Sequence, residues 1–438
     1  MAISQNFPEE GPTLNLNFAG SKVLDPRITF SRSSVGTYMD ENGLVATAST
    51  DSPRFDHRYV NGEVESLGLL VEEQRENLLN YSEDFSASPG GWSLSATGAS
   101  RTQNLIGPDG VANSAWTITD SDNSNDLPQF YKQISISASS STKYCISCFM
   151  KDVDNAGITP DLYVFFLGNS TRGSYVRYTF STDSFTAHAA DGGGIQPSIY
   201  GSIPYPNGWV RLYFVVDDSN NGSNTALQFR IYPNSRWSNK TGSMGFFGAQ
   251  VEVGSFPTSY IPTSGSTKTR NHDRAYYENV DQTDWFSKTE GTIVFEHTDV
   301  PYHSSTSTGW PAVGFGETAG GGSNPSIQYL ITKDYGAGTY LARRFYPNGD
   351  SANINVSGAG SAAPASKVGF VYKEDDYVLV RNGSVVGTDS SGAVPSAYML
   401  ILGMNAISNT GNNWNAHLKN LQYYPTRLSN TVLQNLTK

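Results

Sequence analysis

Strict alternation of apolar and polar side chains constrains this chain more than any other feature. In the run Trp209–Val216 every second residue is apolar, so that one face of an extended strand is wholly hydrophobic. Residues 174–180 and 227–232 repeat the pattern, and loops rich in Asn, Ser and Gly, such as 217–224, separate these runs. Regularly spaced strands joined by such loops predict a jelly-roll or a related β-sandwich.

Composition indicates the same fold class. The 438 residues include 25 Tyr, 21 Phe, 43 Gly and 21 Pro, whereas charged residues reach only 16%. Aromatic residues fit pleated, half-buried surfaces, and Gly and Pro supply turns. We therefore predict an all-β protein of tandem, jelly-roll-like β-sandwich domains, with an irregular N-terminal segment and one short C-terminal helix. Ser429 can cap that helix, whose apolar stripe has three- and four-residue spacing: Leu428, Val432, Leu433 and Leu436.

The chain is too long for one ordinary core, and its pattern divides it into three segments. Residues 1–76 alternate short apolar groups with turn sequences. Residues 77–273 carry the alternating strands and end in a linker of loop composition. Residues 274–438 restart the strand pattern, and the pair Asn382-Gly383 predicts a tight hairpin because both residue types tolerate positive φ.

Charge and hydropathy exclude two classes of partner. The net charge is −11 and the pI is near 5.0, and no run of Lys and Arg could follow a phosphate backbone, so we expect no nucleic-acid binding. No apolar stretch approaches the ~20 residues that span a bilayer, so we expect no membrane insertion. The polar start, Met1–Gly11, lacks the apolar core of a signal peptide.

Cys145 and Cys148 form a C-x-x-C pair inside an apolar, strand-like run. A redox pair would begin a helix, and a zinc site would need two further ligands nearby. Residues i and i+3 of a strand point to opposite faces. We therefore predict two buried free thiols with no chemical role.

Long phrases in the first 85 residues carry a family resemblance. They are Leu24–Ser34 (LDPRITFSRSS), Asp51–His57 (DSPRFDH), Leu67–Leu79 (LGLLVEEQRENLL) and Tyr81–Phe85 (YSEDF). Together they resemble the N-terminal virion-attachment module of bacteriophage head-spike and tail-fibre proteins.

The other two segments resemble the domains that follow this module in that family. Residues 77–273, with the phrases 206–211 (PNGWVR) and 248–263, are similar to a carbohydrate-binding-module-like β-sandwich. Residues 274–438, with 380–383 (VRNG) and the ending at 418–429, are similar to a laminin-G or concanavalin-A-like domain. The resemblance covers nearly the whole chain.

The resemblance implies a virion structural or adhesive protein that is made in the host cytoplasm and displayed on the particle. It further implies a homotrimer that contacts other virion proteins and a host-surface polysaccharide. The number of aromatic residues favours the trimer as well, because surplus exposed aromatics are usually covered by a partner. Head and tail locations stay open.

Charged residues within the N-terminal phrases admit two interpretations. Asp56 beside His57 would suit acid–base chemistry. We favour a structural role, in which these charges pair to hold an irregular segment against its neighbours: Asp25, Arg32, Arg54, Asp56 and Glu72. The sequence has no G-x-S-x-G elbow, no strand with the three alternating acids of a glucanase and no zinc-binding histidine spacing. We therefore predict that the chain is not an enzyme.

Tryptophans in polar loops are the candidates for glycan binding, because a pyranose stacks its apolar side on an aromatic ring. Trp237 has Arg236 and Asn239 beside it, and Trp310 and Trp414 lie in similar loops. We predict glycan contacts at these five residues; the alternative is that each ring packs on a neighbouring domain or subunit.

A calcium site is the one metal site that we consider. Asp120, Asp122 and Asp126 place carboxylates along an acidic loop, as a calcium loop would. The loop lacks the Gly and the final Glu of an EF-hand, and a plain solvated loop is favoured. We expect no other cofactor.

Three functions therefore remain open. The first is an adhesive appendage, either a tail fibre or a head spike or decoration, that binds host glycans. The second is a structural connector or capsid-decorating protein without a ligand. The third is a polysaccharide depolymerase, for which neither a clustered acid pair nor a long repeat is visible.

Substitution of Trp237 by Ala tests the glycan prediction. Losing a stacked ring should weaken adsorption to host cells by about tenfold, the factor that corresponds to ~1.4 kcal/mol, while folding and assembly stay intact. Adsorption and light scattering measure the two properties. A destabilised oligomer would instead identify the ring as an interface residue.

Overall fold

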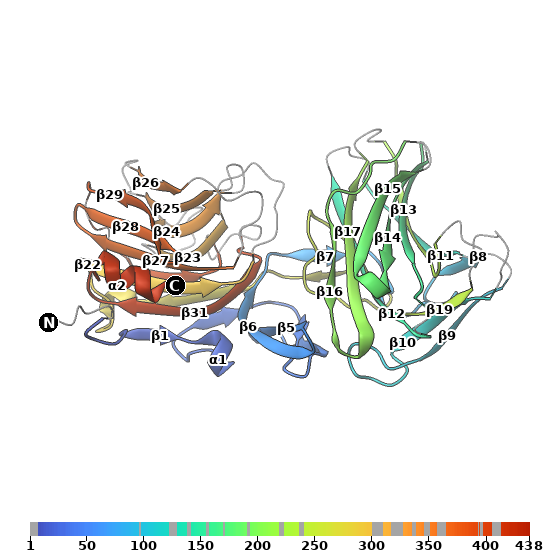
Figure 1. Cartoon of the computed structure of the whole chain (residues 1–438), viewed down its shortest axis with the longest axis horizontal. Helices are drawn as coiled ribbons and strands as arrows, with labels where there is room; N and C mark the ends of the chain where they lie inside the picture. Colours follow the sequence, from blue (N-terminus) through green and yellow to red (C-terminus); the bar gives the residue numbers. More distant parts are fainter. Residues whose placement is uncertain are drawn as a thin grey trace.

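A computed structural model describes residues 8–95, 98–121, 129–137, 142–154, 157–169, 171–190, 193–218, 223–235, 241–299, 310–316, 327–334, 339–345, 351–356, 365–392, 394, 397–404 and 413–438. These residues form mostly β-strands, which confirms the predicted all-β class. Figure 1 shows two β-sandwich lobes at the two ends of an elongated molecule, with strands of the N-terminal segment between them.

The second segment forms a sandwich of two antiparallel sheets. One sheet has the order β16 (Tyr200–Pro204), β17 (Trp209–Asp217), β12 (Lys143–Asp152), β19 (Gly242–Val253), β10 (Ala115–Asp120), β9 (Ala99–Leu105). The other has the order β15 (Ser184–Ala190), β14 (Arg172–Thr179), β13 (Asp161–Leu167), β18 (Ala226–Tyr232), β11 (Gln129–Ser135), β8 (Ser93–Ser95). Their inward faces enclose an aromatic-rich core in which Trp92 stacks on Phe130, with ring centroids 4.9 Å apart.

The third segment forms a second sandwich. One sheet has the order β29 (Ser384–Asp389), β28 (Asp376–Arg381), β27 (Ser366–Lys373), β22 (Glu290–His297), β31 (Ala416–Tyr424), β6 (Glu63–Val71), β5 (Phe55–Val60), and β1 (Leu14–Leu16) also pairs with β31. The other has the order β2 (Thr29–Ser31), β21 (Arg274–Glu278), β30 (Met399–Leu402), β23 (Trp310–Gly316), β24 (Ile327–Asp334), β25 (Thr339–Phe345), β26 (Ser351–Val356).

The N-terminal segment, expected to be irregular, is built from short strands that belong to other sheets. Strands β1, β5 and β6 extend one sheet of the third-segment sandwich, and β2 extends the other. Strand pairing and burial explain why these strands join the sandwich. Strands β1 and β6 both pair with the long β31, and this pairing places Leu16 and Leu69 in the sandwich core. The boundary at residue 76 stays a prediction, but residues on both sides of it share these two sheets.

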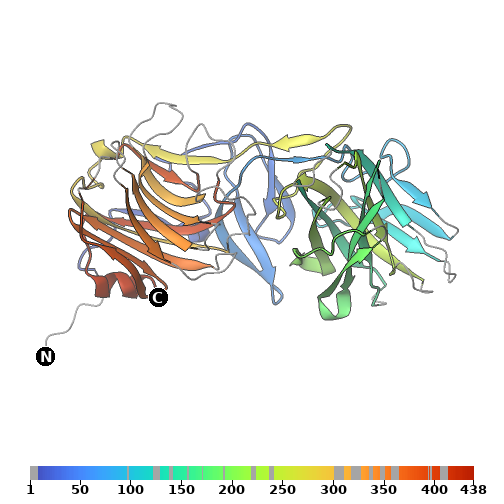
Figure 2. The ribbon, with the colours of Figure 1, turned by 90° about the horizontal axis from the view of Figure 1, so that it is seen from above.

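The remaining elements are short. They are β3 (Gly36–Met39), β4 (Val45–Ala48), β7 (Arg75–Asn77), β20 (Lys268–Arg270), the helices α1 (Phe18–Ser21) and α2 (Asn430–Leu436), and the 3-10 turns η1 (Phe180–Thr182), η2 (Pro206–Gly208) and η3 (Val280–Gln282). Strand β7 pairs with β20, and Figure 2 shows this pair running between the two lobes.

Local predictions at the C-terminus are confirmed. Asn382 and Gly383 take φ values of 46° and 77° and close the hairpin between β28 and β29. The Ser429 hydroxyl accepts a hydrogen bond from the backbone N–H of Val432, 3.3 Å away, and so caps α2. None of the helices in the described part of the chain has the length and apolar character needed to cross a membrane.

The cysteine prediction is also confirmed. Cys145 and Cys148 are buried free thiols on β12. Cys148 faces the core, whereas Cys145 faces the other side of the sheet, beside Glu252. Burial raises the pKa of both thiols, so neither is a reactive thiolate at neutral pH.

A cluster of buried charges joins the N-terminal segment to the linker. Arg32 and Arg54 bind the two carboxylate oxygens of Asp273, and Arg54 also donates to Glu72 over 2.7 Å. Arg270 lies 3.4 Å from the same Glu72 oxygen, and all five side chains are buried. Because each residue lies at or next to a strand end, one cluster fixes the ends of β2, β5, β6, β20 and β21.

Mutual attraction keeps this cluster ionised. Burial would raise the pKa of Glu72, but the neighbouring Arg270 and Arg54 hold it well below its ordinary value. Burial would lower the pKa of Arg54, and the carboxylates of Asp273 and Glu72 instead raise it. The structural role predicted for Arg54 and Glu72 is therefore confirmed. Asp25 is different, since it pairs locally with Arg27 at the surface.

Asp273→Asn should lower the free energy of unfolding by about 3–5 kcal/mol, because two buried guanidinium groups lose their shared counter-charge. Urea denaturation followed by tryptophan fluorescence measures this. The control Asp25→Asn breaks a partly exposed pair and should cost about 1 kcal/mol or less. Equal effects of the two substitutions would contradict the role given to the cluster.

Candidate functional site

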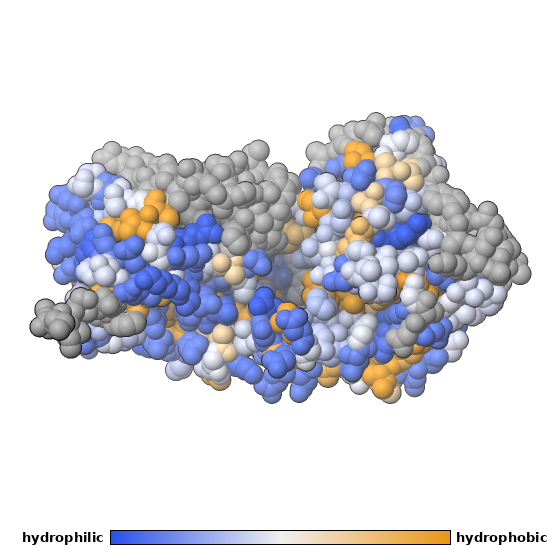
Figure 3. All heavy atoms as spheres, in the orientation of Figure 1, coloured by the Kyte–Doolittle hydropathy of each residue, from blue (hydrophilic) through white to orange (hydrophobic). Residues whose placement is uncertain are grey.

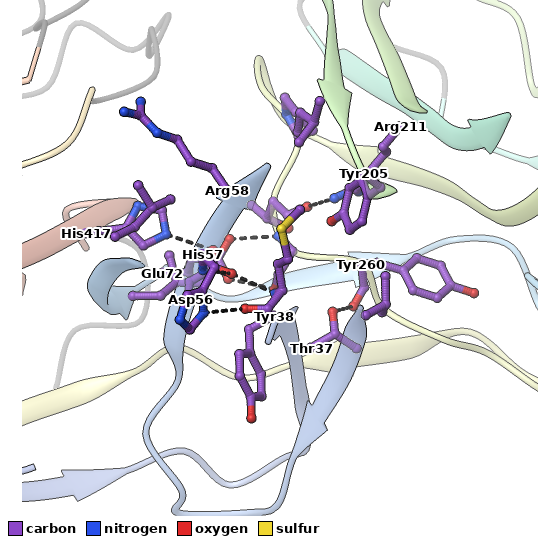
Figure 4. Close-up of a pocket in the computed structure, with 18 of the residues that line it drawn as sticks. Thr37, Tyr38, Asp56, His57, Arg58, Glu72, Tyr205, Arg211, Tyr260 and His417 are labelled. Atoms are coloured by element: carbon purple, nitrogen blue, oxygen red, sulfur yellow. Dashed lines mark hydrogen bonds and ion pairs between the residues drawn. The ribbon is translucent and has the colours of Figure 1, made fainter. Parts of the chain in front are cut away.

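A cavity of about 240 Å³ lies where the N-terminal segment meets both sandwiches. Its walls come from β3 and β4, from β5 and β6, from the turn between β16 and β17, from residues 257–260 and from the start of β31. Figure 4 shows these side chains around the cavity, and Figure 3 shows that the surface is hollowed between the two lobes.

Asp56 is the central acidic group of the cavity. A bulge in the pairing of β5 with β6 lies between Asp56 and His57, and both residues line the wall. Oδ1 of Asp56 accepts the backbone N–H groups of Met39, at 2.7 Å, and His57, at 3.0 Å. Oδ2 accepts a hydrogen bond from Nε2 of His417 at 2.8 Å. The side-chain partner of Asp56 is therefore His417, not the adjacent His57.

Hydrogen bonds fix the tautomers of both histidines. Nδ1 of His57 lies 3.0 Å from the carbonyl oxygen of Met39, and since a carbonyl only accepts, Nδ1 carries the proton. Nε2, the other ring nitrogen of His57, is buried with almost no exposed surface and has no hydrogen-bond partner among the described residues. His417 donates from Nε2 to Asp56, so its Nδ1 accepts from the Thr298 hydroxyl over 2.9 Å.

The second-segment sandwich contributes a phenol and a cation. Tyr205 packs edge-on against Phe149, and burial raises the pKa of its hydroxyl, which stays protonated. No described residue hydrogen-bonds to that hydroxyl. Arg211 is buried and donates to the Thr258 carbonyl at 2.7 Å and to the Ser147 hydroxyl at 2.9 Å, which holds the 257–260 wall against β17.

Apolar side chains complete the wall. Val45 and Leu67 come from the N-terminal segment, and Ile203 and Pro257 come from the second segment. The cavity therefore combines an apolar surface with a few convergent polar groups, which is the usual make-up of a small-ligand site.

The tryptophans that the sequence offered as glycan contacts are not brought together at this cavity. Trp414 is 1% exposed in the core of the third-segment sandwich, where its ring packs edge-to-face on His297, so the prediction that it contacts a glycan is wrong. Trp310 begins β23, and its side chain lies outside the described residues. Arg236, Trp237 and Asn239 also lie outside them, and those predictions stay untested.

The physical reason for burial of Trp414 is the pair of asparagines around it. Asn413 donates to the backbone carbonyls of Glu72 and Asp273, and Asn415 donates to the carboxylate of Glu73. The residues that look like a polar loop in the sequence are thus hydrogen-bonded to buried groups just before β31 begins. The Trp414 ring, between the two amides, points into the core.

The calcium prediction gains no support. Asp120 is buried at the end of β10, where its backbone pairs with Gly242. Asp122 and Asp126 lie outside the described residues. The described residues contain no group of three or more His, Cys, Asp or Glu side chains able to hold a metal ion.

Aromatic side chains of the described residues pack against one another within the chain. On the outer face of β13 and β14, Tyr163 stacks on Phe165 and on Tyr175, and these rings are at most 5% exposed. Among the large apolar side chains that are exposed in the described residues, a single one, Tyr200, is aromatic. The surplus of exposed aromatics that favoured a trimer is therefore not found among the described residues, and the trimer stays a prediction.

Sequence reasoning missed the cavity almost entirely. Asp56 was considered as an acid–base partner of His57 or as one of the structural charges, and His417 and Tyr205 were not considered for a site. The turn phrase at 206–211 placed Tyr205 before a strand, but its approach to β5 depends on how the two sandwiches are docked.

No family model and no curated protein matches the chain. Among solved structures, the IT-sialidase CBM40 of Ruminococcus gnavus bound to α2,3 sialyllactose is 16% identical, covering 35% of this chain and 84% of that one, with a TM-score of 0.29. A botulinum neurotoxin type C structure is 12% identical over 38% of this chain and 40% of that one, with a TM-score of 0.30. Trypanosoma rangeli sialidase is 10% identical, covering 74% of this chain and 60% of that one, with a TM-score of 0.30. Scores this low identify neither family nor function.

Acid should destabilise the site region through His297. Burial lowers the pKa of His297 to about 4, so the folded state holds this ring neutral while the unfolded state protonates it near pH 6.5. This contribution to the free energy of unfolding is full above pH 6.5 and falls by up to about 1.4 kcal/mol per unit toward pH 4. Urea denaturation at a series of pH values should show that the free energy of unfolding falls less steeply toward acid in His297→Phe than in the unmodified chain. Identical pH slopes in the two proteins would contradict this.

Proposed function

We propose that this protein is an adhesive bacteriophage virion protein, a tail fibre or head spike, that binds a surface glycan in the cavity between its two sandwiches. The observation that carries the glycan part is the cavity itself, where an apolar wall stands beside the carboxylate of Asp56 and the hydroxyl of Tyr205, which no described residue bonds. Sugars need both kinds of surface, because their C–H faces are apolar and their hydroxyl groups both donate and accept.

The virion part rests on the phrases of the first 85 residues. They supply residues to the cavity wall and to the buried charge cluster alike, since Asp56 and His57 belong to one phrase and Glu72 to another. In this proposal the N-terminal segment both attaches the protein to other virion proteins and completes the glycan site. The protein forms a homotrimer on the particle.

A structural connector is the competing function. The burial of Trp414 and of the stacked rings of Tyr163, Phe165 and Tyr175 favours it. Aromatic side chains that could have bound a ligand are used for packing. The Tyr205 hydroxyl and the Asp56 carboxylate of the cavity wall favour adhesion instead, because the hydroxyl groups of a ligand can bond to them.

Hydrolysis of the glycan is not part of the proposal. A glycosidase uses two carboxyl groups that flank the bond. Of the acidic residues that line the cavity, Glu72 is ion-paired with Arg54 and hydrogen-bonded by Ser259, so Asp56 has no second acid to work with.

Tyr205→Phe tests the proposal, because it removes one hydroxyl and leaves the packing of the ring in place. Binding of the chain to host cells and to a glycan array should weaken about three- to tenfold, the effect of one lost hydrogen bond. Tyr200→Phe is the matched control, since Tyr200 is exposed on β16 and does not line the cavity. Binding that is equally strong in both variants would place the glycan elsewhere, and no binding by the unmodified chain would favour the connector.

A further inference from the structure

We infer that the cavity receives a single neutral sugar ring, the terminal residue of a glycan, inserted end-on. This inference rests on the proposed glycan-binding function and adds the class of ligand and the direction from which it enters. Size, hydrogen-bonding pattern and charge each point to it.

Size limits the ligand to about one ring. The cavity holds about 240 Å³, which is below the ~300–1,000 Å³ of pockets that take drug-sized ligands. Its walls come from both sandwiches and from the N-terminal segment, and the volume leaves the further residues of a glycan outside it. A terminal residue meets this limit with a single linkage that leaves the cavity.

The free polar atoms call for a ligand that donates and accepts. Oδ2 of Asp56 has one lone pair beyond its bond to His417. The Tyr205 hydroxyl, by contrast, is protonated and able to donate. The hydroxyl groups of a sugar satisfy both atoms, since each hydroxyl is both donor and acceptor.

Charge selects a neutral ring over an acidic one. The carboxylate of a uronic or sialic acid carries acceptors only, and it would face the Asp56 carboxylate. The nearby cations do not offset this. Arg58 is exposed and binds Glu65 through two hydrogen bonds, and Arg211 is bonded to Thr258 and Ser147.

The apolar wall gives the ring its second contact. Val45, Leu67, Ile203 and Pro257 line the cavity and offer an aliphatic surface to the C–H groups of a pyranose. With hydroxyl groups bound on one side and C–H groups on the other, the ring is oriented as well as held.

Saturation-transfer NMR on the full chain tests this inference. The probes are methyl α-glucoside, methyl α-galactoside, N-acetylglucosamine and rhamnose, with N-acetylneuraminic acid and galacturonic acid as the acidic arm. We expect transfer to at least one neutral sugar and to neither acid. Tyr205→Phe removes the donor and should weaken binding of the positive sugar about three- to tenfold, whereas the control Tyr200→Phe, on the exposed part of β16, should not.

The outcomes separate this inference from the proposed function. If only acidic sugars bind, or if polysaccharide binds and no monosaccharide does, the end-on neutral ring is wrong while glycan binding stands. If neither binds, both proposals fail. A neutral sugar that binds to Tyr205→Phe as tightly as to the unmodified chain, with the fold of the variant checked by circular dichroism, also overturns the inference.

Discussion

The buried ion pairs around Asp273 are the interaction on which the rest of the structure depends. Three guanidinium groups and two carboxylates come from five separate places in the chain and meet with almost no exposure to water. Isolated buried charges would be unstable, so each member needs all the others in position. The cluster is therefore stable only when the N-terminal segment, the linker and the third-segment sandwich are assembled together.

The cavity inherits its shape from this cluster. Glu72 binds Arg54 and also accepts from the backbone and hydroxyl of Ser259, which ties the 257–260 wall to the end of β6. Arg211 holds the same wall from the opposite side through the Thr258 carbonyl. A ligand site between two sandwiches would ordinarily vary as the sandwiches move, and these bonds fix one wall to both of them.

Sequence patterns predicted the strands well because strand alternation is local. The run at 209–216, the hairpin at Asn382-Gly383 and the capped helix after Ser429 are all found as expected. Burial of both cysteines followed from the same reasoning. The pairing of β1 and β6 with β31 could not be predicted, because it joins residues more than 300 positions apart and no local pattern specifies that register.

The site was harder to predict than the fold for the same reason. His57 and His417 look like scattered histidines in the sequence, and only the sheet order β5, β6, β31 brings them to one wall. The prediction for Trp414 was wrong for a different reason. Its polar neighbours suggested that the ring is exposed, but the amide of Asn413 donates to buried backbone carbonyls. Counting polar neighbours does not show whether those neighbours face water.

A crystal structure of the chain soaked with a sugar that it binds tests the central claim most directly. We expect one pyranose ring in the cavity, with hydroxyl groups within hydrogen-bonding distance of Asp56 Oδ2 and the Tyr205 hydroxyl. A sugar bound at the loop of Trp237, or a cavity that holds only water while sugar occupies another surface, would contradict it.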